Sequence, residues 1–339
     1  MRPAWFVLLA LTACRPTACQ SPPSPPPSAS PPSALATDEP PAKPAPPARR
    51  CEPGARTCVD DVVVQCNSDG TPGDTLERCQ GACRDGACAE TCAIQDVELV
   101  YVVDDSNRLL SFDPRKLPED PFHLVGTLAC DPDSTPNSMA VDRLGIAWLG
   151  YQNGKVFRAS IVDGHCNPSG TKPRGAPRTF SMGFVTDGPK STSEKLWVAG
   201  GTEDPDRTLA TLDTTLWTWT PVGSLTSPLA NPELTGTSEG KLFAYFPSPG
   251  RGFVQELDRK TATAIGTPWT LPGTPLKVEA YAFAHWGGVF YVFTTADGVS
   301  SVHAIHKKTG KVELVRDDLP YVIVGAGVST CAPLLERVP

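Results

Sequence analysis

The sequence predicts an all-β chain whose larger part is built from a repeated unit. From residue 97 onward, short apolar runs alternate with glycine-containing turns, which is typical of strands joined by tight turns. One short run with an aromatic residue at its second position recurs five times in this region. Seven of the 12 cysteines lie between residues 51 and 92, which indicates a small disulfide-stapled module ahead of the repeats.

The first element is a short apolar start that ends in a cysteine. Residues 3–13 are long enough for the apolar part of a signal peptide and too short to span a bilayer. Leu11-Thr12-Ala13-Cys14 resembles the lipobox of bacterial lipoproteins. That resemblance implies cleavage before Cys14 and attachment of palmitate-type chains to its thiol. In such lipoproteins an Asp after the lipidated cysteine prevents export to the outer membrane, so Arg15 at this position implies export. Cys19 fits the lipobox less well, and an ordinary cleaved signal peptide is the alternative.

A proline-rich tether follows the anchor. Residues 21–50 contain 12 prolines among Ser, Ala and Lys, a composition that cannot bury enough apolar surface to fold. We expect a semi-rigid polyproline II spacer that holds the folded part away from the membrane. The predicted divisions are a signal peptide (1–13), the lipidated cysteine with its linker (14–50), a cysteine-rich module (51–92) and a propeller domain (93–339).

The cysteine-rich module is too small to fold on a hydrophobic core alone. Its only run typical of a strand is Val62-Val63-Val64, and turn-forming residues fill the gaps. We expect three disulfides among Cys51, Cys58, Cys66, Cys79, Cys83 and Cys88, with the pairing open among 15 possibilities. A zinc site is the competing interpretation, which export and the absence of His among these cysteines disfavour. The pattern resembles short cysteine-rich modules of predicted myxobacterial lipoproteins, which carry no known chemistry.

The repeat has a period in the mid-forties. Its aromatic residues stand at intervals of 47, 49, 46 and 48 residues and are Tyr101, Trp148, Trp197, Phe243 and Tyr291. Each of the last four copies has a preceding strand, and many end in an Asp-containing turn. About four short strands per copy at this period are typical of propeller blades. The identical position of the aromatics favours packing between blades over a stacking platform for sugars.

The two ends of the repeat region complement each other. The first copy lacks a preceding strand, and residues 322–330 form a preceding strand with no aromatic strand after it. Their pairing would complete a fifth blade from both ends of the domain. Six blades, another β-repeat and a sandwich are the alternatives. The closure places Cys92 beside Cys331, and the copy boundaries place Cys130 near Cys166, so we predict both bridges.

Several segments of residues 97–339, among them ELTGTSEGKLFAYF and AFAHWGGVFYVF, resemble a group of uncharacterised myxobacterial lipoproteins. The resemblance implies the architecture and a surface location, and it brings no known active site.

The candidate site residues lie where the innermost strands begin. Aligned on the turn glycines, Ser138, Ser181 and Glu233 share one level, and Asn137 and Glu279 lie near it. Two carboxylates and an amide around a channel suit Ca²⁺ or another hard cation, although both glutamates are more simply interpreted as solvated strand-end residues. VDRLGIAWLG (141–150) also resembles repeats of propeller-type sugar-lactone hydrolases. The run 104–108, with Ca²⁺-loop residue types, is more simply a hairpin turn.

Three functions remain from the sequence. The chain has no basic patch, and its net charge of −7 argues against nucleic acid. It also lacks an H-E-x-x-H and a phosphate-binding glycine loop. His303 and His306 point to opposite faces of a strand, and His285 at a turn is interpreted as structural or surface. We favour a binding module for a glycan or surface protein over a metal-dependent hydrolase or lactonase in the channel. A structural envelope component is the third possibility.

Overall fold

The computed structural model describes residues 51–59, 62–79, 82–84, 86–89, 91–189, 191–201, 207–225 and 231–335. The predicted signal peptide, the tether, Cys14 and Cys19 lie outside these residues. The described part is all β, apart from one 3-10 turn, η1 (Pro114–Lys116). None of its helices is long and apolar enough to cross a membrane.

Five four-stranded antiparallel sheets make up the larger part of the described chain, and in each of them the innermost strand is named first. The first comprises β9 (Pro136–Val141), β10 (Ile146–Tyr151), β11 (Val156–Ser160) and β12 (Cys166–Thr171). The second comprises β13 (Ser181–Thr186), β14 (Glu194–Gly200), β15 (Thr208–Asp213) and β16 (Thr218–Ser224). The third comprises β17 (Glu233–Gly236), β18 (Leu242–Phe246), β19 (Arg251–Leu257) and β20 (Ala264–Pro272). The fourth comprises β21 (Ala280–Trp286), β22 (Val289–Ala296), β23 (Val299–His306) and β24 (Val312–Leu319).

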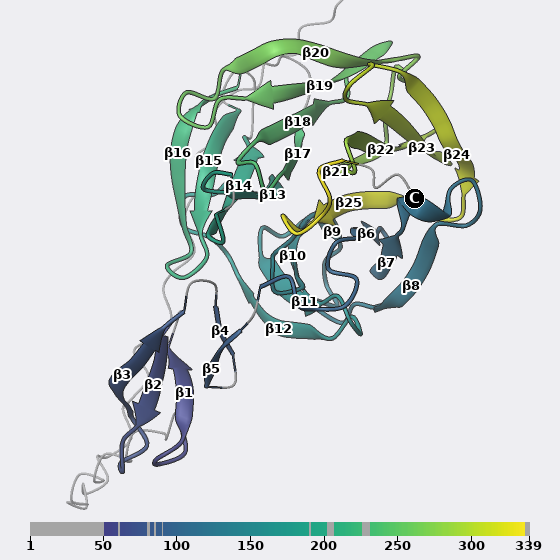
Figure 1. Cartoon of the computed structure of the whole chain (residues 1–339). Coiled ribbons are helices and arrows are strands. Elements are labelled where there is room, and N and C mark those ends of the chain that lie inside the picture. Colours follow the sequence, from purple (N-terminus) through teal and green to yellow (C-terminus); the bar gives the residue numbers. More distant parts are fainter. Residues whose placement is uncertain are drawn as a thin grey trace, which may run out of the picture. The chain divides into compact units, whose positions relative to one another are not determined.

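The fifth sheet draws on both ends of the repeat region. It comprises β25 (Ile323–Val328), β6 (Val100–Asp104), β7 (Arg108–Phe112) and β8 (Phe122–Thr127). β25 pairs antiparallel with β6, with Gly327 opposite Tyr101 and Val328 opposite Val100. Figure 1 shows the sheets around a common centre, with β9, β13, β17, β21 and β25 innermost. This is the arrangement of a β-propeller.

The repeated aromatics pack between neighbouring sheets, as their common position predicts. Five buried clusters fill the spaces between successive sheets. Each contains one of Tyr101, Trp148, Trp197, Phe243 and Tyr291, set against residues of the next sheet. Tyr291, for example, meets Phe112 of the fifth sheet edge to face, with ring centroids 5.2 Å apart. The aromatics therefore hold the sheets to one another and are not available to stack on a ligand.

The Asp-containing turns also form as expected. Asp213 accepts hydrogen bonds from the backbone N–H groups of Thr215 and Leu216, and Asp258 accepts from those of Lys260 and Thr261. The run 104–108 is a hairpin turn, in which Asp104 accepts from the N–H groups of Ser106 and Arg108 and pairs with the Arg108 side chain. These carboxylates serve their own turns.

The cysteine-rich module has more strands than the sequence predicts. A three-stranded sheet contains β1 (Arg56–Val59), β2 (Val62–Cys66) and β3 (Pro72–Arg78), and a hairpin contains β4 (Ala82–Arg84) and β5 (Ala87–Ala89). The expectation of a single strand is wrong, because β1 and β3 form through backbone pairing with β2 and lack an apolar run of their own. Backbone pairing leaves no such trace in the sequence.

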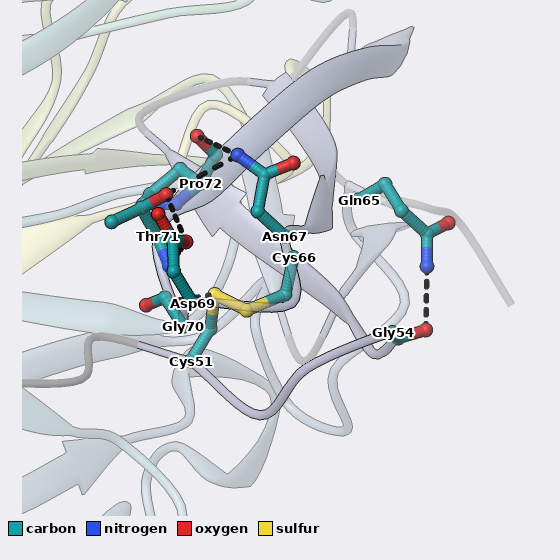
Figure 2. Close-up of a disulfide and its surroundings, with 9 residues drawn as sticks. All are labelled: Cys51, Gly54, Gln65, Cys66, Asn67, Asp69, Gly70, Thr71 and Pro72. Atoms are coloured by element: carbon teal, nitrogen blue, oxygen red, sulfur yellow. Dashed lines mark hydrogen bonds between the residues drawn. A yellow bond between two sulfur atoms is a disulfide. The ribbon is translucent and has the colours of Figure 1, made fainter.

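Disulfides hold this module together. The bridges are Cys51–Cys66, Cys58–Cys83 and Cys79–Cys88, one of the 15 possible pairings. Figure 2 shows the first of them beside a tight turn, in which Asp69 accepts from the backbone N–H and the hydroxyl of Thr71. All six cysteines are therefore taken up by sulfur–sulfur bonds, so the zinc interpretation fails.

Two further bridges lie in the propeller part. Cys92 is bonded to Cys331 and Cys130 to Cys166, which are the two pairs that the sequence predicts. The first links the residues just before β6 to those just after β25. The second links the end of the fifth sheet to β12 of the first.

Candidate functional site

A cavity of about 210 Å³ lies where the innermost strands begin. Asn137 of β9, Phe180 before β13, Glu233 of β17, Tyr281 of β21 and Val324 of β25 all line it. Each of the five sheets therefore contributes a residue from the same end of its innermost strand. Gln152, Thr179, Asn231, Glu279 and Ala280 complete the lining.

Glu233 is the buried acid of this cavity. Only 5% of the residue is exposed, so the expectation of a solvated strand end is wrong for it. Its Oε2 accepts a hydrogen bond from the Ser138 hydroxyl, at 3.2 Å, and no ion pair to it forms among the described residues. Burial holds the pKa of the Glu233 carboxyl well above its usual range, and the bond from Ser138 offsets only part of that rise. Burial therefore favours the protonated carboxylic acid over the carboxylate.

Tyr281 lines the cavity beside this acid. Its hydroxyl donates to the backbone carbonyl of Asn231 at 2.7 Å, which leaves the lone pairs of the phenol oxygen as acceptors. Burial raises the pKa of Tyr281, and Glu233 and Tyr245 add to the rise, so the phenol stays neutral.

Two asparagine side chains complete the polar lining. The Oδ1 atom of Asn231 is buried and has no hydrogen-bond partner. Oriented as its surroundings require, the Asn137 amide donates to the carbonyls of Gly150 and Tyr151, at 3.1 and 3.3 Å. An unpartnered buried acceptor costs free energy, which a donor brought by a ligand would recover.

The other predicted site residues are placed differently. Glu279 is exposed at the rim of the cavity, and its Oε2 accepts from the backbone N–H of Gly298 at 3.2 Å. Ser181 is buried, but its hydroxyl donates to the carbonyl of Ala199 in the neighbouring strand of its own sheet. Ser138 acts through its bond to Glu233. The five predicted residues therefore do not converge on one point.

This geometry does not favour a metal centre. Within the described ranges, no group of three or more His, Cys, Asp or Glu residues is close enough to hold a metal ion. Glu233 has no second buried carboxyl beside it among the described lining residues, and Glu279 lies at the exposed rim. A hard cation prefers several charged oxygens around it.

Sequence reasoning missed Tyr281, Asn231 and Phe180. Phe180 is the first residue of the expected strand 180–185 and lies directly before β13, and Asn231 lies two residues before β17. Tyr281 stands two residues after Glu279 in the run EAYAFA, and strand periodicity places these two side chains on the same face. That periodicity was the available signal for Tyr281.

The histidines do not form a site. The expectation that His285 lies at a turn is wrong, because it lies within β21 and is 2% exposed. Its ring stacks on Phe243 with a centroid distance of 6.0 Å, and burial lowers the pKa of His285 to about 3. His303 and His306 lie three apart on β23, and His306 Nε2 meets Glu313 Oε2 at 3.3 Å.

No protein-family model matches the chain, and no curated protein matches it in sequence. Three solved structures are similar in fold. A nidogen/laminin complex gives a TM-score of 0.42 at 13% identity and covers 80% of this chain and 95% of its own. The Dos1 propeller gives 0.37 at 12% identity, covering 70% and 72%. A mitotic checkpoint complex gives 0.34 at 13% identity, covering 66% and 65%. At these scores the likeness carries no inference about function.

Proposed function

We propose that the chain is a lipid-anchored protein of the bacterial cell envelope whose propeller binds a small polar ligand in the cavity around Glu233. The observation that carries the proposal is the convergence on one cavity of residues from four innermost strands and from Phe180, directly before the other one, β13. A site built this way needs the whole ring to be assembled, and it combines apolar walls with a few fixed polar groups, as small-molecule sites do.

The proposal includes a ring of five blades closed by β25. Three relationships support it: β25 pairs with β6, its glycines lie against the backbone of β9, and a buried cluster joins the fourth and fifth sheets. Without this closure the cavity would lack the wall that Val324 supplies.

The envelope location rests on the lipobox around Cys14 and on the disulfides. Five disulfides in one chain require an oxidising compartment, which the cell exterior and the periplasm provide. We place the protein on the outer membrane of a Gram-negative bacterium, held by lipid at Cys14, with the proline-rich segment as spacer. The contact with the membrane is through the anchor.

A binding role is favoured over the lactonase alternative. A hydrolase of that kind needs a bound metal to polarise its substrate. Of the two described carboxyl groups that line the cavity, that of Glu233 is buried and that of Glu279 is exposed at the rim. Such an arrangement suits recognition of a ligand better than binding of a metal.

The test is a ligand screen on the full chain in detergent. Thermal unfolding is followed in the presence of sugars, amino acids, amines and short carboxylic acids. A ligand that binds the native protein raises the unfolding temperature, and the stabilisation grows with the logarithm of one plus the ratio of the ligand concentration to Kd. We expect hits that disappear in Tyr281→Phe and Glu233→Gln, and that remain in Ser181→Ala, whose hydroxyl bonds outside the cavity. Hits that are insensitive to the first two changes would place the ligand elsewhere.

A further inference from the structure

The polar groups that line the cavity offer hydrogen-bond acceptors, and no cationic side chain of the described residues lies among them. Among the described residues, the Glu233 carboxyl has a single hydrogen-bond partner, Asn231 Oδ1 has none, and the Tyr281 hydroxyl donates its proton to a backbone carbonyl. Glu279 adds a carboxylate at the rim. No Lys, Arg or His occurs among the described residues that line the cavity.

From this we propose that the ligand is a small organic ammonium ion, whose N–H groups bind to Glu233 and Asn231. The inference rests on the proposed function, since it names the ligand class of the same cavity. An ammonium head brings three donors and one positive charge, while the acceptors of the cavity lack donors and the buried acid lacks a counter-ion. An anion would meet two acids with no compensating charge.

The apolar residues of the lining determine the hydrocarbon part that the ligand can have. Phe180, Ala280, Val324 and the ring of Tyr281 form walls against which a compact hydrocarbon body can pack. Aromatic faces also attract ammonium groups. A cavity of about 210 Å³ admits a small amine and excludes a peptide or an oligosaccharide in full.

Because burial favours the protonated form of Glu233, we expect binding of the ammonium ion to release a proton. The ligand enters as R–NH₃⁺, the Glu233 carboxylic acid loses its proton to solvent, and an ammonium–carboxylate pair remains. No covalent bond to the ligand forms or breaks. Below the pKa of the buried acid, affinity should therefore rise as pH rises, by up to about tenfold per pH unit.

Other titratable groups near Glu233 do not replace it in this role. Tyr245 of β18 and Tyr281 of β21 stay neutral, because burial raises the pKa of both phenols. Glu279 is at the exposed rim. Arg207 acts electrostatically on Tyr281 but does not line the cavity. Near the acid, β9 contributes Asn137 and Ser138, β25 contributes Val324, and Phe180 lies directly before β13; none of these side chains titrates.

The test compares three probes of the same shape and different charge: benzylammonium, benzyl alcohol and benzoate. Each is titrated into the full chain at pH 6, 7 and 8 by calorimetry, in two buffers of different ionisation enthalpy so that proton release is counted. We expect benzylammonium to bind most tightly, to gain affinity with pH and to release about one proton.

Two variants distinguish the loss of the ammonium–carboxylate pair from a loss of folding. Glu233→Gln keeps the shape of the side chain, and we expect it to weaken benzylammonium roughly 10- to 100-fold and to abolish the pH dependence. Glu279→Gln is the matched rim control and should change affinity by only a few-fold. Circular dichroism and the unfolding temperature verify that each variant is folded.

The outcomes are distinguishable. Benzyl alcohol binding as tightly as the amine, with no proton release, overturns the ammonium proposal and leaves the proposed function in place. Calcium chloride alone raising the unfolding temperature through Glu233 also overturns it, in favour of an inorganic cation. If no probe binds and the broader screen gives no hit in the cavity, both proposals fail.

Discussion

Glu194 of β14 accepts a hydrogen bond at 2.7 Å from the hydroxyl of Thr330, which follows β25 and is 136 residues away in sequence. The same carboxyl accepts from the backbone N–H of Arg143, which follows β9. Three sheets therefore meet at one acid, at the end of the innermost strands opposite to the cavity. Burial raises the pKa of Glu194 to about 7, and the negative charge of Asp142 adds to the rise. The hydrogen bonds from Thr330 and Arg143 lower this pKa and offset only part of the rise.

This acid predicts a pH-dependent stability. A carboxyl whose pKa is raised in the native state binds more protons when folded, so its contribution is full below the unfolded value of 4.5 and is lost as pH rises towards 7. Since the residue remains partly exposed, we expect the free energy of unfolding to fall by about 2 kcal/mol across this window. Urea unfolding between pH 4.5 and 8 measures it.

Glu194→Gln should remove this component and flatten that part of the profile, while keeping the bond to Thr330. A profile of unchanged slope in the variant would mean that Glu194 does not titrate in this window. Glu239→Gln, an exposed acid in the turn after β17, serves as the control and should leave the slope unchanged.

The bridge between Cys92 and Cys331 should stabilise the propeller more than the one between Cys130 and Cys166. The two bridges close loops of 239 and 36 residues. The chain-entropy model then predicts a cost of about 5 kcal/mol for removing the first and about 4 kcal/mol for the second. Paired Cys→Ala variants, unfolded in urea, give the comparison. If Cys92→Ala/Cys331→Ala loses an equal or smaller free energy of unfolding than the other pair, this bridge restricts the conformations of the unfolded chain only slightly.

The strands of the propeller part could be predicted because each has its own signal. The innermost strands are apolar runs, the second strands carry the aromatic, and Asp marks the turns. The module strand β1 could not be predicted, because Arg56–Val59 forms a strand only by pairing with β2. Pairing between segments far apart in the sequence can be predicted only where each segment belongs to an incomplete copy of the repeat, as β6 and β25 do.

The candidate site was predictable only in part. Alignment of the repeats placed Ser138 and Glu233 at one level, and their side chains are 3.2 Å apart. It could not show that Glu233 is buried, because a glutamate at a strand start is usually solvated. It also misplaced Glu279, which lies one residue ahead of β21 and turns to the N–H of Gly298, so that Tyr281 takes the position facing the cavity.

The proposed lipid anchor at Cys14 predicts a simple loss of membrane association when that cysteine is replaced. When the chain is expressed with an alkyne analogue of palmitate in a Gram-negative host, we expect the label to be attached and the protein to remain in the membrane fraction. Cys14→Ala should lose both, since the acyl chains supply the binding free energy. Cys19→Ala is the matched control and should keep both. Label retained in Cys14→Ala but lost in Cys19→Ala would move the anchor to the second cysteine.

The proposed closure of the ring predicts a large effect from a single added methyl group. A Cβ added at Gly327 of β25 would lie 2.9 Å from the Cα and carbonyl carbon of Ala140 and from the nitrogen of Val141, all backbone atoms of β9. Backbone in the middle of a sheet cannot move aside as a side chain can, so the two innermost strands must separate. We expect Gly327→Ala to lower the free energy of unfolding by about 2–3 kcal/mol.

Gly188→Ala is the control for that substitution, because nothing lies within 4 Å of the Cβ it would add. It should change stability by no more than about 0.5 kcal/mol. Because the cavity needs β25 beside β9 and β21, Gly327→Ala should also weaken any ligand of the cavity, whereas Gly188→Ala should not. If Gly327→Ala is as stable as the wild type and binds as well, β25 does not lie against β9 and the ring is not closed there.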